Sequence, residues 1–170
     1  MCKITTYKSA VALFYAPSNI SGTSGMRCER IHTVSSWCRG PPWYNCVLVV
    51  TDQSNETMDG MEIAQVCLLS SFKYSNGKTY ECALVDWYSR LQKHDANNGM
   101  WMVKPDILAN GSPFTVVIHV DTILCCAHLI PVYDSSRPVP HAMKYSDSLD
   151  SFDMYYINRY ADHHMYKVVI

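Results

Sequence analysis

Charged side chains are scarce in this sequence, at 17% of its 170 residues, compared with about 25% in ordinary soluble domains. The formal net charge is only -1. A protein that binds nucleic acid or an anionic membrane through its surface charge needs a basic patch, and this composition supplies none. We therefore expect direct nucleic-acid binding to be weak or absent. The 12 tyrosines predict a surface covered largely by uncharged polar side chains.

Long apolar runs are also missing. No stretch of 18 consecutive apolar residues occurs, so we expect no transmembrane helix and no membrane partner. The first eight residues lack the apolar core of a secretory signal peptide, and the apolar patch over Ser9 to Ala16 is short and ends at Pro17. We expect an intracellular protein.

The sequence lacks the closely spaced cysteine pairs that zinc ribbons and redox motifs contain. The chain has eight cysteines but no Cys-x-x-Cys pair, and its only close pair is Cys125 and Cys126. Thiols stay reduced inside cells, and a free cysteine within an apolar strand behaves as a small hydrophobic residue. The cysteines therefore predict filling of the core rather than a disulfide framework.

Catalytic signatures are missing too. The sequence contains no Gly-x-Ser-x-Gly, no glycine-rich phosphate loop and no His-Glu-x-x-His. Four aspartates that could converge into an acidic cleft, Asp86, Asp95, Asp106 and Asp121, are scattered along the chain. We expect no enzymatic activity and no cofactor.

Strand patterns are what the sequence does contain. Cys46 to Val50 is an apolar, β-branched run typical of a buried strand. Glu62 to Phe72 and Lys78 to Tyr88 are separated by Asn76-Gly77, a dipeptide that accepts positive φ at both central positions of a two-residue hairpin turn. Neither face of the second run is fully polar, which predicts a central strand.

Shorter runs predict the remaining strands, at Val11–Tyr15, Met100–Lys104, Phe114–Val120 and His128–Tyr133. Pro131 lacks an N–H group, so the last of these belongs at a sheet edge or a bulge. Turn residues are frequent in 1–45, which predicts an irregular N-terminal segment packed on a β domain spanning 46–170.

The C-terminal region changes to a helical period. Apolar residues fall at Leu149, Phe152, Tyr156, Ile157 and Tyr160, which predicts one helix over about 149–162. Together these patterns predict a mainly β protein, a small antiparallel barrel with a C-terminal helix.

Two polar clusters could bind metal. The first comprises His119, Asp121, Cys125, Cys126 and His128, and the second is Asp162-His163-His164. Adjacent residues on a strand or helix diverge, so neither spacing suits one ion. The main expectation is therefore no metal; the alternative is a metal-binding protein or metal-dependent hydrolase that uses His119, Asp121, His128 and His163.

The aromatic residues could form a cage for a methylated ammonium group or a peptide groove. The candidates are Trp37, Trp43, Trp87, Trp101, Tyr80 and Tyr88. The competing interpretation is that these large side chains fill the core. For a binding surface we favour Trp87, Tyr88 and Trp101.

Several ordered motifs, spread over roughly residues 14–168, resemble one known group of proteins. They are Phe14–Ser18, Gly25–Ile31, Cys82–Tyr88, Gly99–Val103, Val117–Leu124, Ala127–Tyr133, Ser148–Phe152 and Asn158–His164. Together they resemble the C-terminal region of large repetitive proteins of mushroom-forming fungi, which are associated with Plavaka-type (CACTA-like) transposons. The resemblance implies a detached accessory module, because the nuclease domain of such transposases lies upstream.

The departures from that group are informative. By resemblance we expect arginine where this chain has Cys28, His32, Cys38, Trp43 and Cys125, and each is a change that a single C-to-T mutation in an arginine codon produces. The resemblance therefore also allows a decayed copy without selected function, whose lost arginines would weaken any contact with nucleic acid.

A weaker similarity, at the level of the fold, is to bromo-adjacent homology (BAH) domains of chromatin proteins. It lies in the order of the hairpin, Trp87-Tyr88, Asp121-Thr122-Ile123 and His128–Val132. It favours an SH3-like barrel, a nuclear location and a chromatin protein or peptide as partner. The leading expectation is a non-catalytic binding module of a transposon-derived fungal protein.

Overall fold

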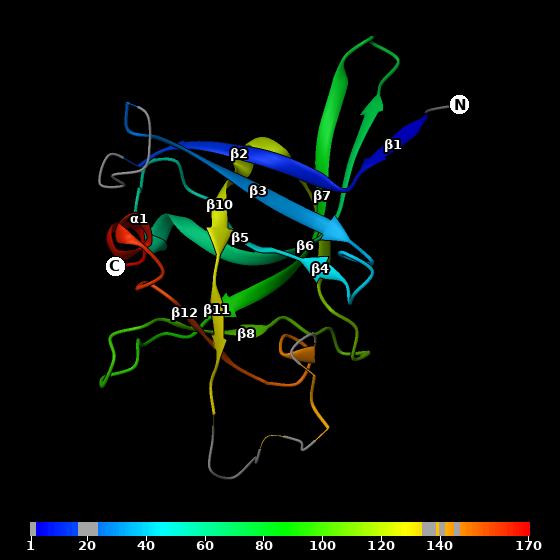
Figure 1. The fold of residues 1–170 in the computed structure, drawn as a ribbon. Coiled ribbons are helices and arrows are strands. Elements are labelled where there is room, and N and C mark those ends of the chain that lie inside the picture. Colours follow the sequence, from blue (N-terminus) through cyan, green and yellow to red (C-terminus); the bar gives the residue numbers. More distant parts are fainter. Residues whose placement is uncertain (1–2, 17–23, 134–138, 140–141, 145–146) are drawn as a thin grey trace.

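The described part of the chain folds into two antiparallel sheets and one short helix (Figure 1). This computed structural model describes residues 3–16, 24–133, 139, 142–144 and 147–170. The larger, nine-stranded sheet comprises β1 (Ile4–Tyr7), β5 (Cys46–Val50), β6 (Met61–Lys73), β7 (Thr79–Arg90), β8 (Met102–Pro105), β9 (Thr115–His119), β10 (Ile123–Ala127), β11 (Leu129–Pro131) and β12 (Tyr155–Ile157). The three-stranded sheet comprises β2 (Ser9–Tyr15), β3 (Met26–Val34) and β4 (Trp43–Tyr44). The helix is α1 (His163–Val168), and 3₁₀ turns occur at Met58–Gly60 and Val120–Thr122.

The large sheet curls into a nearly closed barrel, as the sequence predicts. Its main path runs β10-β5-β6-β7-β8-β12-β11. Only His128 separates β10 from β11, so one stretch of chain supplies both ends of the path. Pro131 lies in β11, at an end of that path, which confirms the predicted edge position.

The predicted hairpin of the two central strands is confirmed, but its turn differs. Of its turn residues, only Gly77 has a positive φ, of 81°. The Gly77 N–H donates to the Tyr74 carbonyl at 3.0 Å, and the Tyr74 N–H donates to the Lys78 carbonyl at 2.9 Å. Asn76 instead accepts the Lys78 N–H through its side chain at 2.9 Å. The loop is therefore longer than two residues, with glycine taking the one left-handed position.

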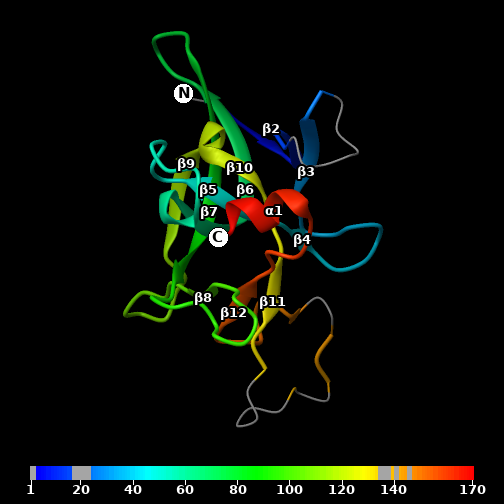
Figure 2. The same cartoon turned by 90° about the vertical axis from the view of Figure 1, so that its left-hand side faces the viewer.

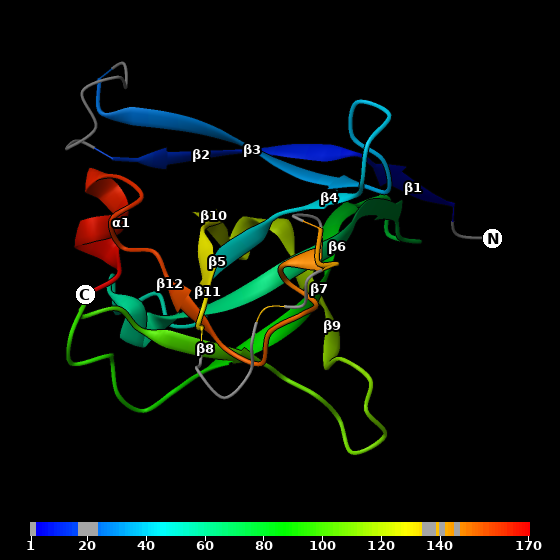
Figure 3. The same cartoon turned by 60° about the horizontal axis from the view of Figure 1, so that its bottom comes forward.

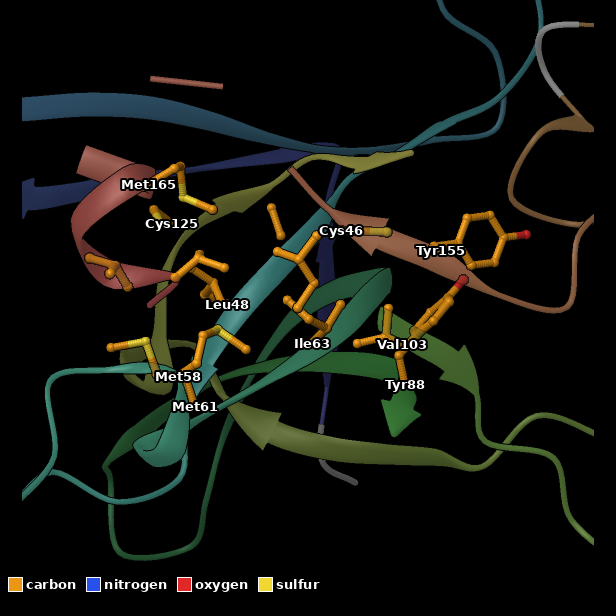
Figure 4. Packing of buried hydrophobic residues seen from close by; sticks show 14 of the residues in the cluster. Cys46, Leu48, Met58, Met61, Ile63, Tyr88, Val103, Cys125, Tyr155 and Met165 are labelled. Carbon is orange, nitrogen blue, oxygen red and sulfur yellow. The ribbon is translucent and has the colours of Figure 1, made fainter. Parts of the chain in front are cut away.

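Alternating residues of β5 enter two different hydrophobic clusters. Cys46 and Leu48 pack in the barrel interior, together with Ile63, Tyr88 and Tyr155 (Figure 4). Val47 and Val49 point the other way, into a second cluster with Ile31, Ala64, Val66, Leu69, Ala83 and Val85. Burial on both faces explains why this strand is apolar without interruption.

The N-terminal segment is more regular than the sequence predicts. Ser9–Tyr15 and Met26–Val34 pair along their length as an antiparallel ribbon, which crosses over the barrel (Figure 3). Its inward-facing Ala10, Ala12 and Ile31 cover the second cluster. The prediction of an irregular segment was wrong because the turn residues mark the ends of two strands rather than a continuous loop. Pro17 and the six residues after it lie outside the described residues.

The C-terminal helix exists, but the predicted span of 149–162 is wrong. Residues Tyr155–Ile157 form β12, and the helix covers His163–Val168, beside β10 (Figure 2). The aromatic and β-branched residues of β12 pair with both β8 and β11, and these long-range contacts override the local helical spacing. The helix begins after Asp162, whose carboxylate accepts the Met165 N–H at 2.8 Å.

Candidate functional site

Two exposed tryptophans, Trp37 and Trp43, line a groove on the surface of the protein. Trp37 and Trp43 are 40% and 41% exposed, and their rings meet edge to face with centroids 5.0 Å apart. His32 packs against both rings, at 4.5 Å and 5.0 Å. The groove has a volume of about 850 Å³, and its further lining includes Pro42, Gln65, Cys67, Leu149 and Asp150.

A tight turn fixes the position of Trp37. The Trp37 N–H donates to the Pro41 carbonyl at 3.0 Å, and the Gly40 N–H donates to the Trp37 carbonyl at 2.7 Å. Cys38 and Arg39 between them both adopt positive φ, of 50° and 62°. Left-handed backbone at non-glycine residues costs free energy and persists where the surrounding structure imposes it. The turn therefore holds Trp37 against Trp43.

A second groove of about 440 Å³ continues the first, because both are lined by Gln65, Leu149 and Asp150. Four carboxylates line this part, from Asp86, Asp106, Asp150 and Asp153, against a single lysine, Lys104. We call the two together the aromatic–acidic groove. It brings Asp86 and Asp106, two of the four scattered aspartates, into one site.

Asp86 receives two hydrogen bonds inside this groove. The Cys67 thiol donates to one of its oxygens at 3.2 Å, and the Thr115 hydroxyl donates to the other at 2.5 Å. Cys67 occupies a bulge of β6, where the pairing with β7 shifts between Val66 and Leu68. Burial, together with the nearby Asp86 carboxylate, raises the pKa of the Cys67 thiol to about 12. A thiol held neutral in this way is a poor nucleophile.

Tyr155, whose ring packs edge to face against Tyr88, supports the segment that carries Asp150. The Tyr155 hydroxyl lies 2.7 Å from the Leu149 carbonyl and 2.9 Å from the Phe152 carbonyl, both of which can accept its proton. Burial raises the pKa of Tyr155 to about 12 and raises the pKa of Tyr88 still further, with the Asp150 charge adding to both effects. Both phenols therefore stay neutral, and the Tyr155 hydroxyl holds the segment that carries Asp150.

The three aromatic residues favoured from the sequence do not form one surface. Trp87 and Tyr88 both line the acidic part of the groove, but Tyr88 is only 4% exposed and belongs to the core. Trp101 lies elsewhere, with the Arg90 guanidinium 4.5 Å from its ring centre and His94 at its edge. Trp101 therefore lies apart from the two residues of β7, and a binding role for Trp87, Tyr88 and Trp101 stays a prediction.

The residues of the metal alternative are dispersed. His119 and Asp121 lie 3.4 Å apart, and both are exposed. His128 contacts the Asn158 amide at 3.1 Å, and His163 is exposed at the start of α1. Among the residues that the structure describes, no three His, Cys, Asp or Glu side chains gather in an arrangement able to hold a metal ion.

Sequence reasoning found part of the groove and missed the rest. Trp37 and Trp43 are among the predicted cage aromatics, and the adjacent Pro41-Pro42 signals the turn that presents them. Asp150 and Asp153 were missed because they fall within the predicted helix. Their position depends on β12 and on the Tyr155 hydroxyl, which no local pattern reports.

Comparisons with known protein families, curated proteins and solved structures found no match. Within the described residues, no helix is long and apolar enough to cross a membrane.

Proposed function

We propose that the chain is a non-catalytic binding module that receives a cationic side chain of a protein or peptide in the aromatic–acidic groove. The observation that carries the proposal is the perpendicular, half-exposed pair Trp37 and Trp43 at one end of a groove lined by four carboxylates. The module's place in a transposon-derived fungal protein with a chromatin partner is part of the proposal and rests on the resemblance described above.

The aromatic end suits a methylated ammonium group. Ring faces attract cations, and a quaternary ammonium group loses little hydration when it enters such a site. His32 packs against the two indoles and limits their movement. The exposed ring surface is therefore partly preorganised, which reduces the entropic cost of binding.

The acidic end suits further positive charges on the same peptide. Asp86, Asp106 and Asp150 line a groove that contains one lysine, so its electrostatic potential favours a basic segment. A lysine-rich tail, such as those of chromatin proteins, has this chemistry. The high thiol pKa of Cys67 favours a binding function over a catalytic one.

The test is a titration of lysine-containing peptides that carry unmodified, trimethylated or acetylated lysine, followed by calorimetry. We expect the trimethylated peptide to bind and the acetylated peptide, which lacks the charge, to fail. Trp43→Ala should weaken binding about tenfold, because one cation–π contact is worth roughly 0.5–2 kcal/mol.

Trp101→Ala is the matched control, since it also removes a tryptophan but lies outside the groove. Asp150→Asn should weaken binding in a salt-dependent manner. Equal binding of all three peptides, or a larger loss from Trp101→Ala than from Trp43→Ala, would contradict the proposal.

A further inference from the structure

We propose that the outer edge of β2 binds an extended basic peptide as an additional strand. Among the described strands, β2 pairs only with β3 and ends the three-stranded sheet. This site lies on the opposite side of the ribbon from β4, which carries Trp43. The inference is therefore independent of the function proposed above.

The register shows which main-chain groups face the open edge. The Ala16 N–H donates to the Gly25 carbonyl at 2.7 Å, and the Thr33 N–H donates to the Lys8 carbonyl at 2.9 Å. In an antiparallel pair such bonds recur at every second residue, so the even-numbered residues of β2 bond to β3. Ser9, Val11, Leu13 and Tyr15 therefore direct their N–H and C=O groups outward, as an edge that can accept another strand.

A groove of about 430 Å³ runs along this edge. Four consecutive residues of β2, Ala10 to Leu13, line it. Side chains of a strand alternate between faces, so consecutive residues line one groove when their main chain borders it. The small Ala10 and Ala12 leave the space open, and Leu69 and Ile123 form apolar walls. The groove can thus receive both the backbone and the alternate side chains of a peptide.

Charge identifies the kind of peptide. Glu81 and Asp121 line this groove, and Glu81 also lines the neighbouring hollow beside Tyr7 and Ser9. Among the described residues, no lysine or arginine lines either hollow. Glu81 forms no ion pair with any residue in the described part of the chain. An apolar strand with a lysine or arginine at its ends complements this site.

A second copy of the chain fits the edge less well. The sequence of β2 is SAVALFY and contains no basic residue. Two-fold pairing of β2 with itself would bring Glu81 and Asp121 of both copies toward one interface. Each copy would add two carboxylates there, against the one guanidinium of Arg30, which donates to the Ser9 hydroxyl at 3.0 Å. A basic peptide from another protein is therefore the favoured occupant.

The probe is a short synthetic peptide of alternating valine and threonine with a lysine at each end. Binding to the full chain is followed by fluorescence anisotropy and by the amide NMR signals of Val11 and Leu13. We expect the lysine peptide to shift those signals and to bind at least tenfold more tightly than the same peptide with glutamate in place of lysine. Methylation of its alternate backbone nitrogens should abolish binding, because the strand-to-strand hydrogen bonds are lost.

Two variants test the site on the protein. Val11→Pro removes an N–H group that points outward and makes no bond to β3. An edge strand tolerates proline at such a position. The variant should therefore fold and should not bind the peptide. The double variant Glu81→Gln, Asp121→Asn should weaken binding about tenfold. It removes two exposed ion pairs with the peptide lysines, each of which contributes up to roughly 1 kcal/mol. Glu62→Gln, an exposed carboxylate on β6 outside both grooves, is the matched control and should bind normally.

Several outcomes would overturn the inference. These are equal binding of the lysine and glutamate peptides, no binding of either, full binding of the backbone-methylated peptide, or unchanged amide signals of Val11 and Leu13. A dimer in sedimentation that Val11→Pro dissociates would show that a second copy covers the edge instead. If Val11→Pro fails to fold, the methylated peptide on the unmodified chain still decides the question.

Discussion

At the scale of single residues, His164 links stability to pH. It stacks on Phe14 with ring centroids 5.0 Å apart, and its Nε2 is buried without a hydrogen-bond partner among the described residues. Burial lowers the pKa of His164 below 6.5, although the Asp162 carboxylate partly opposes the shift. The folded protein therefore resists protonation of a ring that the unfolded chain protonates readily.

We expect the free energy of unfolding to fall as the pH drops below about 6.5, down to the lowered pKa of the folded state. The unfolded chain binds more protons in that window, so protonation favours unfolding, and the full contribution is present above it. Urea unfolding of the wild type and of His164→Gln, at a series of pH values, measures the effect. A pH slope that is identical in both proteins would contradict the assignment to His164, since the other histidines are common to both.

Residue positions also show the limit of local prediction. Strand alternation along β7 places Tyr88 in the barrel interior and Trp87 against the second cluster. The approach of Asp150 to Asp86 depends instead on the pairing of β12 with β8 and β11, from which the Tyr155 hydroxyl holds the Leu149 carbonyl. A residue placed by its own strand is predictable, and one placed by another element's side chain is not.

At the scale of elements, Asp162 joins α1 to the β2–β3 ribbon. Its carboxylate caps the helix through the Met165 N–H at 2.8 Å and forms an ion pair with Arg27. Arg27 also pairs with Glu29 at 2.8 Å, and Glu29 accepts the Cys126 N–H at 3.0 Å. Burial of Asp162 raises its pKa, but the hydrogen bonds from Met165 and Arg27 outweigh burial and leave the pKa lowered.

Removal of the Asp162 carboxylate should destabilise the fold. Asp162→Ala loses both the cap and the ion pair, and a lost cap alone costs about 0.5–2 kcal/mol. Asp162→Asn keeps a capping oxygen and should lose less. The difference between the two variants in urea unfolding measures the cap; equal stability of both would assign the whole effect to the ion pair.

The elements themselves divide into predictable and unpredictable ones. The β6–β7 hairpin and β5 follow from alternation, a turn glycine and an uninterrupted apolar run, all local in sequence. The helix was misplaced because its apolar spacing also fits a turn followed by β12. Asp162, a good N-cap residue, was the available signal for the true helix start.

At the scale of the whole molecule, the barrel has hydrophobic residues on both sides of its wall. The inner cluster includes Phe14 of the ribbon and Met165 of α1 beside the barrel strands. The outer cluster, which includes Val47, Val66 and Val85, is covered by Ile31, Ala10 and Ala12 of the ribbon. The predicted boundary at residue 46 would separate the barrel from this cover. The fold class was predictable because the alternation of apolar and polar residues along a strand is local in sequence. Burial of both faces of the barrel wall depends on the β2–β3 ribbon, which was not predicted because turn residues are frequent in this segment.

We therefore expect the fragment 46–170 to fail as an independent domain. Fully exposing one valine side chain forfeits about 1.5–3 kcal/mol, and several valines of the outer cluster lose cover together, against a typical net stability of about 5–15 kcal/mol. The fragment should bind a hydrophobic dye and unfold without a sharp transition in urea, whereas the full chain should not bind the dye and should unfold cooperatively. A chain that lacks only residues 1–8 is the control, because it loses β1, whose residues are all exposed, and keeps the ribbon. Cooperative unfolding of 46–170 would show instead that the barrel is stable without its cover, and that the ribbon is an accessory to it.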